Sequence, residues 1–345
     1  MGSSDQGQFD ENRLNISIEQ MNQEQAGIIS ENVQTTTKVG HGSAHSKIIL
    51  MGEHAVVYDY PAIALPFPAV QVQVTVTASQ HSSSYIDCQY YAGPLEDAPS
   101  MLANLKRAIS LTLDSFKILS QPIQITIDST IPQERGMGSS AAVSVAIVRA
   151  LCDYYSVTIS NKQLHLIVNQ AEVIAHESTS GLDTLMTSTS KPVIYRKSQT
   201  PRPFNLKMDA YLVVADSGQA GQTKLAVNHV RLLKDKKPHL VNELMSAIGN
   251  FVQQAHQAIE MNDAVELGRL MTYNHYYLNQ LGISNPILDR IINAAWLAGA
   301  LGAKLTGGGL GGCVIAITRD EQSAQEVAQV MKEAGAIQSW YLHLG

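Results

Sequence analysis

Alternating hydrophobic and polar residues predict strands in the first half of the chain. Residues 70–77 place valine at every even position and glutamine or threonine at every odd one, the period of a half-exposed strand. Isoleucine repeats in the same way over 123–127. The stretch between these two runs has the apolar spacing of a helix, at Met101, Leu102, Leu105, Ile109, Leu113 and Phe116.

Two further helices are expected in this half, and they differ in exposure. Residues 139–155 are apolar or small nearly all round, as a helix buried on every side must be. Residues 160–176 carry one apolar stripe and begin with Ser160 and Gln163, which have the spacing of a capping box. The first helix is therefore expected inside the core and the second against it.

The second half is expected to be mainly helical and to end in alternating strands and helices. Strand patterns at 192–195 and 211–216 flank Pro201-Arg202-Pro203, the best candidate for a domain boundary. With 345 residues, we expect two domains, at 38–200 and 201–345. The elements expected after this boundary are helices at 224–233, 240–260 and 264–281, a helix that starts at Asn285-Pro286, a strand after Gly302, a strand at 313–317, a helix at 320–333 and a strand near 337–342.

Residues 1–37 form a polar, acidic extension. Six acidic residues against one arginine give this segment a charge of −5, out of −6 for the whole chain. It has no apolar stretch of the secretory type, and its composition is typical of a flexible segment.

Composition narrows the class of protein. Hydrophobic residues make up 45% and charged residues 16%, and no apolar run approaches the ~18 residues of a membrane span. No basic cluster exceeds residues 234–237, so we expect neither a membrane nor a nucleic-acid partner. Three widely spaced cysteines fit neither a disulfide framework nor a zinc site, which favours a cytoplasmic protein.

A glycine-rich turn leads into the buried helix. Its residues, Gly136-Met137-Gly138-Ser139-Ser140-Ala141, let backbone N–H groups approach a ligand at the positive end of a helix. This indicates an anion site, with phosphate as the expected anion, and Ser139 and Ser140 as plain helix caps remain an alternative. No lysine precedes the serines, so the common nucleotide-triphosphate loop is excluded.

A second glycine-rich turn, Lys304 to Cys313, holds five glycines within six residues. Each glycine in a regular element costs on the order of 0.5–1 kcal/mol, so something must favour so many. Close approach of a ligand or of another backbone segment is the expected reason, with a flexible hairpin tip as the alternative.

Three charged residues stand out beside these turns. Lys47 lies on a strand with its side chain opposite to Ile48, where a solvated lysine is the ordinary interpretation. Glu172 lies at the margin of its helix's apolar stripe, within reach of a cleft, although a surface glutamate is more common there. Asp183 follows Gly181 in a turn where helix capping is the default role.

The segments Gly52 to Ala64, Gly136 to Ala142 and Lys304 to Cys313 resemble the motifs of the GHMP small-molecule kinases, in order and spacing, over about residues 39–344. Within that superfamily the first segment is most similar to the mevalonate kinase family. The resemblance implies a two-domain α+β fold, with an N-terminal half like ribosomal protein S5 domain 2 and a ferredoxin-like C-terminal half with added helices. The active site would lie in the cleft between them.

The resemblance also implies a reaction, the ATP-dependent phosphorylation of mevalonate to 5-phosphomevalonate in isoprenoid precursor synthesis. Two sites depart from the family's usual residues, Ser178-Thr179 and the pair Gly308 and Leu310, which bears on substrate fit. The implied roles are catalysis by Asp183 with Lys47, Mg²⁺ binding by Ser140 and Glu172, ATP phosphate binding by Gly136, Met137, Gly138, Ser139, Ser140 and Ala141, and substrate binding by Glu53, His54, Thr306, Gly307 and Gly308.

Other functions remain as alternatives. Phosphomevalonate kinase and diphosphomevalonate decarboxylase act on phosphorylated substrates and should carry extra basic residues. The cations near the motifs are Lys47, Arg135, His54 and Lys304. A non-catalytic nucleotide-binding sensor should have lost a catalytic residue, and none is lost. The resemblance also leaves a homodimer open.

Deleting residues 1–37 is expected to leave the melting temperature and the activity nearly unchanged, because this segment lacks the apolar periodicity needed to dock on a core. Thermal unfolding of the shortened and full-length chains tests this. A loss of many degrees would show that the extension packs on the rest.

Overall fold

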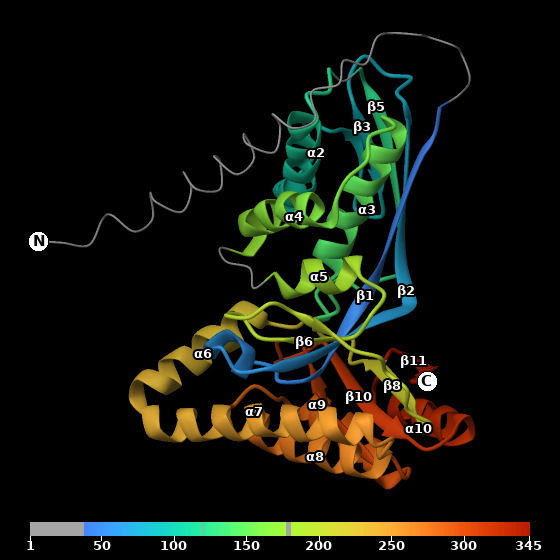
Figure 1. Cartoon of the computed structure of the whole chain (residues 1–345). Helices are drawn as coiled ribbons and strands as arrows, with labels where there is room; N and C mark the ends of the chain where they lie inside the picture. The colour runs from blue at the N-terminus through green and yellow to red at the C-terminus, as the bar shows by residue number, and fades with distance from the viewer. Residues whose placement is uncertain (1–37, 120, 177–180) are drawn as a thin grey trace, which may run out of the picture.

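The computed structural model describes residues 38–119, 121–176 and 181–345. The acidic extension at 1–37 and the departure at Ser178-Thr179 lie outside these residues. We call the larger sheet with helices α2 to α5 the N-terminal half, and the smaller sheet with helices α6 to α10 the C-terminal half (Figure 1).

The larger sheet has seven strands in the order β4-β3-β5-β2-β6-β7, with β1 paired along β2. The valine alternation of β2 is confirmed, since the even-numbered valines are buried and their neighbours face outward. Figure 1 shows β1 and β2 as long strands that run from the top of the N-terminal half to the C-terminal half. The strands are β1 (Gly40–Met51), β2 (Ala62–Ala78), β3 (Tyr85–Cys88), β4 (Tyr91–Pro94), β5 (Ile123–Ser129), β6 (Val193–Tyr195) and β7 (Arg202–Pro203).

Helices cover this sheet as the sequence predicts. The helix α3 packs on β1 and β2 and is buried along almost its whole length, which confirms its prediction. The capping box of α4 is also confirmed, because Gln163 N donates to Ser160 Oγ (3.3 Å) and Ser160 N donates to Gln163 Oε1 (3.0 Å). The helices are α2 (Ala103–Ser115), α3 (Ser139–Tyr154), α4 (Asn161–His176) and α5 (Leu182–Ser188), with 3₁₀ turns η1 (Ala55–Tyr58) and η2 (Ser100–Leu102).

The smaller sheet has the antiparallel order β11-β8-β10-β9. In chain order, helices α6 to α9 connect β8 to β9, and α10 connects β10 to β11. This is the expected ferredoxin-like arrangement. Asn285 caps α9 by accepting a hydrogen bond from Leu288 N (3.0 Å), and Pro286 follows it as predicted. The elements are β8 (Tyr211–Asp216), α6 (Thr223–Lys236), α7 (Pro238–Glu260), α8 (Ala264–Gln280), α9 (Pro286–Leu297), β9 (Gly302–Thr306), β10 (Cys313–Thr318), α10 (Glu321–Glu333) and β11 (Gln338–His343).

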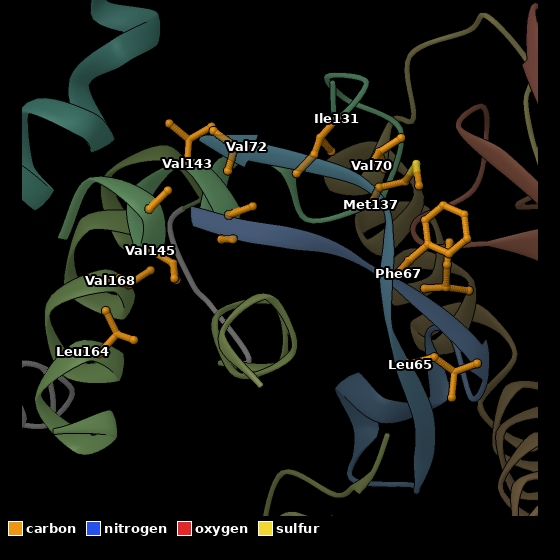
Figure 2. Packing of buried hydrophobic residues seen from close by; sticks show 14 of the residues in the cluster. Leu65, Phe67, Val70, Val72, Ile131, Met137, Val143, Val145, Leu164 and Val168 are labelled. Atoms are coloured by element: carbon orange, nitrogen blue, oxygen red, sulfur yellow. The ribbon is translucent and has the colours of Figure 1, made fainter. Parts of the chain in front are cut away.

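One cluster of buried apolar side chains extends through both halves. Phe67 of β2 meets Trp340 of β11 edge to face, with 6.4 Å between ring centroids. Figure 2 shows Met137, from the first glycine-rich turn, pointing toward Phe67 and Val70 in this cluster. The boundary at residue 200 stays a prediction. The strand β7 still pairs with β6 of the larger sheet.

The three cysteines are free thiols, with Cys152 and Cys313 buried and Cys88 partly exposed. Burial raises the pKa of the Cys152 thiol to about 12, so it stays protonated at neutral pH. Among the helices of the described residues, none combines the length and apolarity that crossing a bilayer requires.

Two matched valines test the packing of α3. Val148→Ala removes a side chain that is 0% exposed, and Val265→Ala makes the same change on α8 at 56% exposure. Both changes gain helix propensity, so their difference reports burial. We expect the first to lower the free energy of unfolding by about 2 kcal/mol more than the second. Equal effects in urea denaturation would contradict the buried position of α3.

Candidate active site

A lysine and an aspartate from distant segments meet between β1 and α5. Lys47 Nζ lies 3.1 Å from Asp183 Oδ1. Lys47 is 3% exposed, so it is buried and does not lie at a solvated rim, whereas the Asp183 side chain is 47% exposed. Gly181 occupies the N-cap of α5 with φ 74°, so Asp183 is the second helical residue and not the cap. The carboxylate therefore faces solvent while a buried ammonium group holds it.

The first glycine-rich turn passes directly over this lysine. Gly138 is the N-cap of α3 and has φ 73°, which favours glycine. A Cβ atom on Gly138 would lie 3.1 Å from Lys47 Cγ, and Lys47 N donates to Met137 O (3.0 Å). The turn thus places the positive end of a 16-residue helix beside the lysine–aspartate pair.

A cluster of oxygens lies at the start of α3. Ser140 Oγ donates to Glu172 Oε1 (2.8 Å), and Ser144 Oγ lies 3.4 Å from the same oxygen. Asn104 Nδ2 donates to Ser140 Oγ (2.8 Å) and to Glu172 Oε1 (3.2 Å). Glu172 is buried and not on the surface. Asn104 was missed by sequence reasoning, since a single asparagine on an amphipathic helix carries no distinguishing signal.

The geometry of this cluster fits a magnesium ion. Neighbouring ligands of an octahedral Mg²⁺, each about 2.1 Å from the metal, lie about 3 Å apart. Ser140 Oγ and Glu172 Oε1 are 2.8 Å apart and are both hard oxygen donors. Within the described residues no group of three or more His, Cys, Asp or Glu side chains converges, so an ion here needs further oxygens from a bound phosphate or water.

The second glycine-rich turn is packed against backbone, which excludes a flexible hairpin tip. Gly307 and Gly136 face each other, so that a Cβ atom on Gly307 would lie 3.0 Å from Gly136 Cα. Added Cβ atoms at three further glycines would meet backbone oxygens, Ile283 O for Gly309 (2.4 Å), Ala220 O for Gly311 (2.2 Å) and Arg135 O for Gly312 (2.8 Å). Of the two expected reasons for the glycines, close approach of other backbone segments is the one observed.

A buried ion pair joins the first motif to the third. Lys304 Nζ binds Glu53 Oε1, and both side chains are fully buried. Burial raises the pKa of Glu53 and lowers the pKa of Lys304, and in each case the partner's charge opposes the shift. Asn274 Nδ2, also absent from the sequence predictions, lies 3.4 Å from Glu53 Oε2.

The other predicted substrate residues also bind protein atoms. His54 Nε2 donates to Gly308 O (2.9 Å), and burial lowers the pKa of His54 to about 4, so the ring is neutral at pH 7. Thr306 Oγ1 donates to Ile49 O (2.8 Å). These side chains therefore connect the two segments of the protein. Their contact with a substrate stays a prediction.

A cleft with mainly apolar walls opens beside the first turn. It is lined by side chains of β3, the turn after it, η2, α2, β5 and α3, among them Cys88, Tyr90, Leu102, Leu105, Ser139 and Val143. A larger cavity of about 480 Å³ lies between α7 and the segment from β6 to β7. It contains none of the predicted site residues, so cavity size alone does not locate the chemistry.

Comparison with known proteins agrees with this geometry. The chain matches the family model for the GHMP kinases N terminal domain over residues 103–191 and that for the GHMP kinases C terminal domain over residues 254–337. The first of these ranges includes the phosphate-loop candidate, Glu172 and Asp183. The second includes the third motif.

Individual relatives narrow the family. The mevalonate kinase of Pyrococcus horikoshii is 33% identical over 320 residues, which cover 86% of this chain and 92% of the relative. The solved structure of L. major mevalonate kinase in complex with R-mevalonate has a TM-score of 0.77 at 25% identity, covering 92% of this chain and 99% of that chain. The solved structure of mevalonate kinase from Staphylococcus aureus has a TM-score of 0.69 at 30% identity, covering 90% of this chain and 100% of that chain. The expected two-domain α+β fold is confirmed, and the chain belongs to the mevalonate kinase family of the GHMP kinases.

Proposed function

We propose that the chain transfers the γ-phosphoryl group of ATP to a hydroxyl of mevalonate, giving ADP and 5-phosphomevalonate. The observation that carries this proposal is the Lys47–Asp183 pair beneath Gly138, in a member of the mevalonate kinase family. Phosphoryl transfer requires mainly positioning and charge stabilisation, and these residues combine an anion-binding turn, a carboxylate and a cation.

The nucleotide phosphates bind the backbone of Gly136 to Ala141. The supporting features are the glycines with positive φ and the N-terminus of α3, both of which favour an anion. Adenine occupies the cleft beside Ser139, where Tyr90, Leu102 and Leu105 offer the apolar walls that a flat ring prefers. Sequence reasoning did not identify these adenine contacts, because they come from separate elements.

Magnesium accompanies the nucleotide, held by Ser140 and Glu172. The bound ion would neutralise charge on the phosphate oxygens. Asn104 keeps the two oxygen ligands in place through its hydrogen bonds to both. Glu172 is buried, and its hydrogen bonds from Ser140 and Asn104 fix its carboxylate beside Ser140 Oγ, which favours a shared ion at these two groups.

Asp183 accepts the proton of the attacking hydroxyl, and Lys47 holds that carboxylate in place through their ion pair. A carboxylate that is 47% exposed reaches the acceptor side of the cleft, whereas the buried lysine stays fixed at 3.1 Å. Lys47 also lies beneath Gly138, so its charge is near the transferring group. Glu53, His54, Thr306, Gly307 and Gly308 form the wall of the acceptor pocket, which Glu53 and Thr306 shape through their bonds within the protein.

The alternatives that use phosphorylated substrates are less well supported. Of the four cations near the motifs, Arg135 is paired with Asp216 and Lys304 with Glu53. His54 is neutral, and Lys47 is paired with Asp183. None of the four is therefore left to bind a second phosphate. The sensor alternative is disfavoured because the catalytic pair is assembled and not merely present. We place the enzyme in the cytoplasm, which its three free thiols favour.

Substrate choice tests the proposal. In a coupled ADP-release assay with saturating ATP and Mg²⁺, we expect rapid turnover with mevalonate and only background rates with phosphomevalonate, galactose or homoserine. Comparable turnover with phosphomevalonate or galactose would overturn the mevalonate assignment and leave the kinase class standing. No ADP release with any of the four would contradict the catalytic proposal itself.

Removing the charge of Glu172 or of Asp183 distinguishes the roles of these two carboxylates. Glu172→Gln should weaken metal binding, so raising Mg²⁺ should recover part of the lost rate. Asp183→Asn should lower kcat by ~10²-fold or more without such recovery, because it removes the proton acceptor. Lys47→Met should resemble Asp183→Asn. The measurement is kcat across a Mg²⁺ titration.

The exposed Glu243→Gln on α7 is the matched control for these variants and should change neither kcat nor the Mg²⁺ dependence. Recovery of Asp183→Asn by Mg²⁺, with none for Glu172→Gln, would mean that the two carboxylates have exchanged roles.

A further inference from the structure

Arg135, the residue immediately before the first glycine-rich turn, makes three hydrogen bonds within the protein. Its Nε donates to Asp216 Oδ1 (2.7 Å), its Nη2 to Gly218 O (3.1 Å) and its Nη1 to Gln133 O (3.1 Å). The arginine side chain is 16% exposed and the aspartate 3%. Each guanidinium nitrogen binds a protein oxygen, and two of the three acceptors, Asp216 Oδ1 and Gly218 O, belong to the C-terminal half.

The backbone around Arg135 also contacts the C-terminal half. Gly221 N donates to Glu134 O (2.5 Å), and a Cβ atom on Gly312 would lie 2.8 Å from Arg135 O. Asp216 is the last residue of β8 and also accepts a hydrogen bond from Gly218 N (2.8 Å). Arg135 therefore forms its ion pair with a carboxylate that belongs to the smaller sheet.

The turn beyond Arg135 needs such an anchor. Gly136 and Gly138 both have positive φ, and glycine leaves a backbone segment more freedom than any other residue. The buried Met137 side chain holds the middle of the turn, and α3 follows on its C-terminal side. Arg135 is the corresponding attachment on the N-terminal side.

We propose that Arg135 is a positioning residue, which ties the phosphate-binding turn to the end of β8 and so aligns the γ-phosphoryl group with the acceptor hydroxyl. This inference rests on the proposed function. The proposed wall of the acceptor pocket includes Thr306, Gly307 and Gly308 of the C-terminal half, so the distance between the reacting atoms depends on how the turn sits against that half. Rates of phosphoryl transfer are sensitive to displacements of about 1 Å.

The geometry also distinguishes a positioning role from a simple charge. Three acceptors in fixed directions match the planar fork of a guanidinium, and an ammonium group reaches them only in part. Arg135→Lys is therefore expected to behave like Arg135→Ala. In the alanine variant, ethylguanidine added to the solution should restore part of the rate by occupying the vacated site.

The experiment measures kcat and both KM values for Arg135→Lys and Arg135→Ala with ATP and mevalonate. We expect kcat to fall about 10-fold or more in both variants, with little change in KM for mevalonate. The control is Arg269→Ala, which removes an exposed arginine–glutamate ion pair with Glu266 on α8, outside the three motifs, and should keep the full rate. ADP affinity and melting temperature are recorded for every variant.

Unchanged kcat in a folded Arg135→Ala variant, or full activity of Arg135→Lys, would overturn the positioning role. If the alanine variant does not fold, Arg135→Lys decides the matter by the same criterion. Failure of the proposed function is separately visible, because the unmodified chain would then release no ADP with mevalonate. In that case the variants are compared with whichever acceptor supports turnover, and kcat equal to that of the unmodified chain would overturn the positioning role, as would the absence of turnover with every acceptor.

Discussion

Contact of backbone against backbone is the constraint on which the junction of the two halves depends. Gly307 lies against Gly136, and a Cβ atom on Gly312 would lie 2.8 Å from Arg135 O. Side chains at these positions would separate the halves by the thickness of a methyl group or more. Gly136 belongs to the same turn as Gly138, which lies against Lys47, so this close approach sets how the turn and the Lys47–Asp183 pair sit against the C-terminal half.

Buried charge strengthens the same junction. The pairs Glu53–Lys304 and Arg135–Asp216 each connect a motif of the N-terminal half to a strand of the C-terminal half. Removing such charges from water is costly, and apolar side chains of similar volume often stabilise a fold as well or better. Ion pairs are directional, however, and fix the relative position of two segments where apolar contacts allow sliding. Their place beside the site is consistent with a demand for alignment.

Much of the fold was predictable because its signals are local. The valine alternation of β2, the capping box of α4 and the Asn285-Pro286 helix start each depend on residues a few positions apart. The burial of Lys47 and Glu172 was not predictable, because it depends on partners that are distant in sequence. The same holds for Asn104, whose two hydrogen bonds reach α3 and α4. Family resemblance supplied the roles of these residues where pattern alone favoured ordinary surface positions.

The three thiols differ in a way that bears on how the protein can be studied. Cys152 and Cys313 are buried, and burial raises the pKa of both, so neither offers a thiolate to reagents in the folded state. Cys88 is partly exposed and lines the cleft beside Ser139. The unmodified chain thus carries a single accessible attachment point for a fluorescent label, at the mouth of the cleft where nucleotide binding would change the label's surroundings.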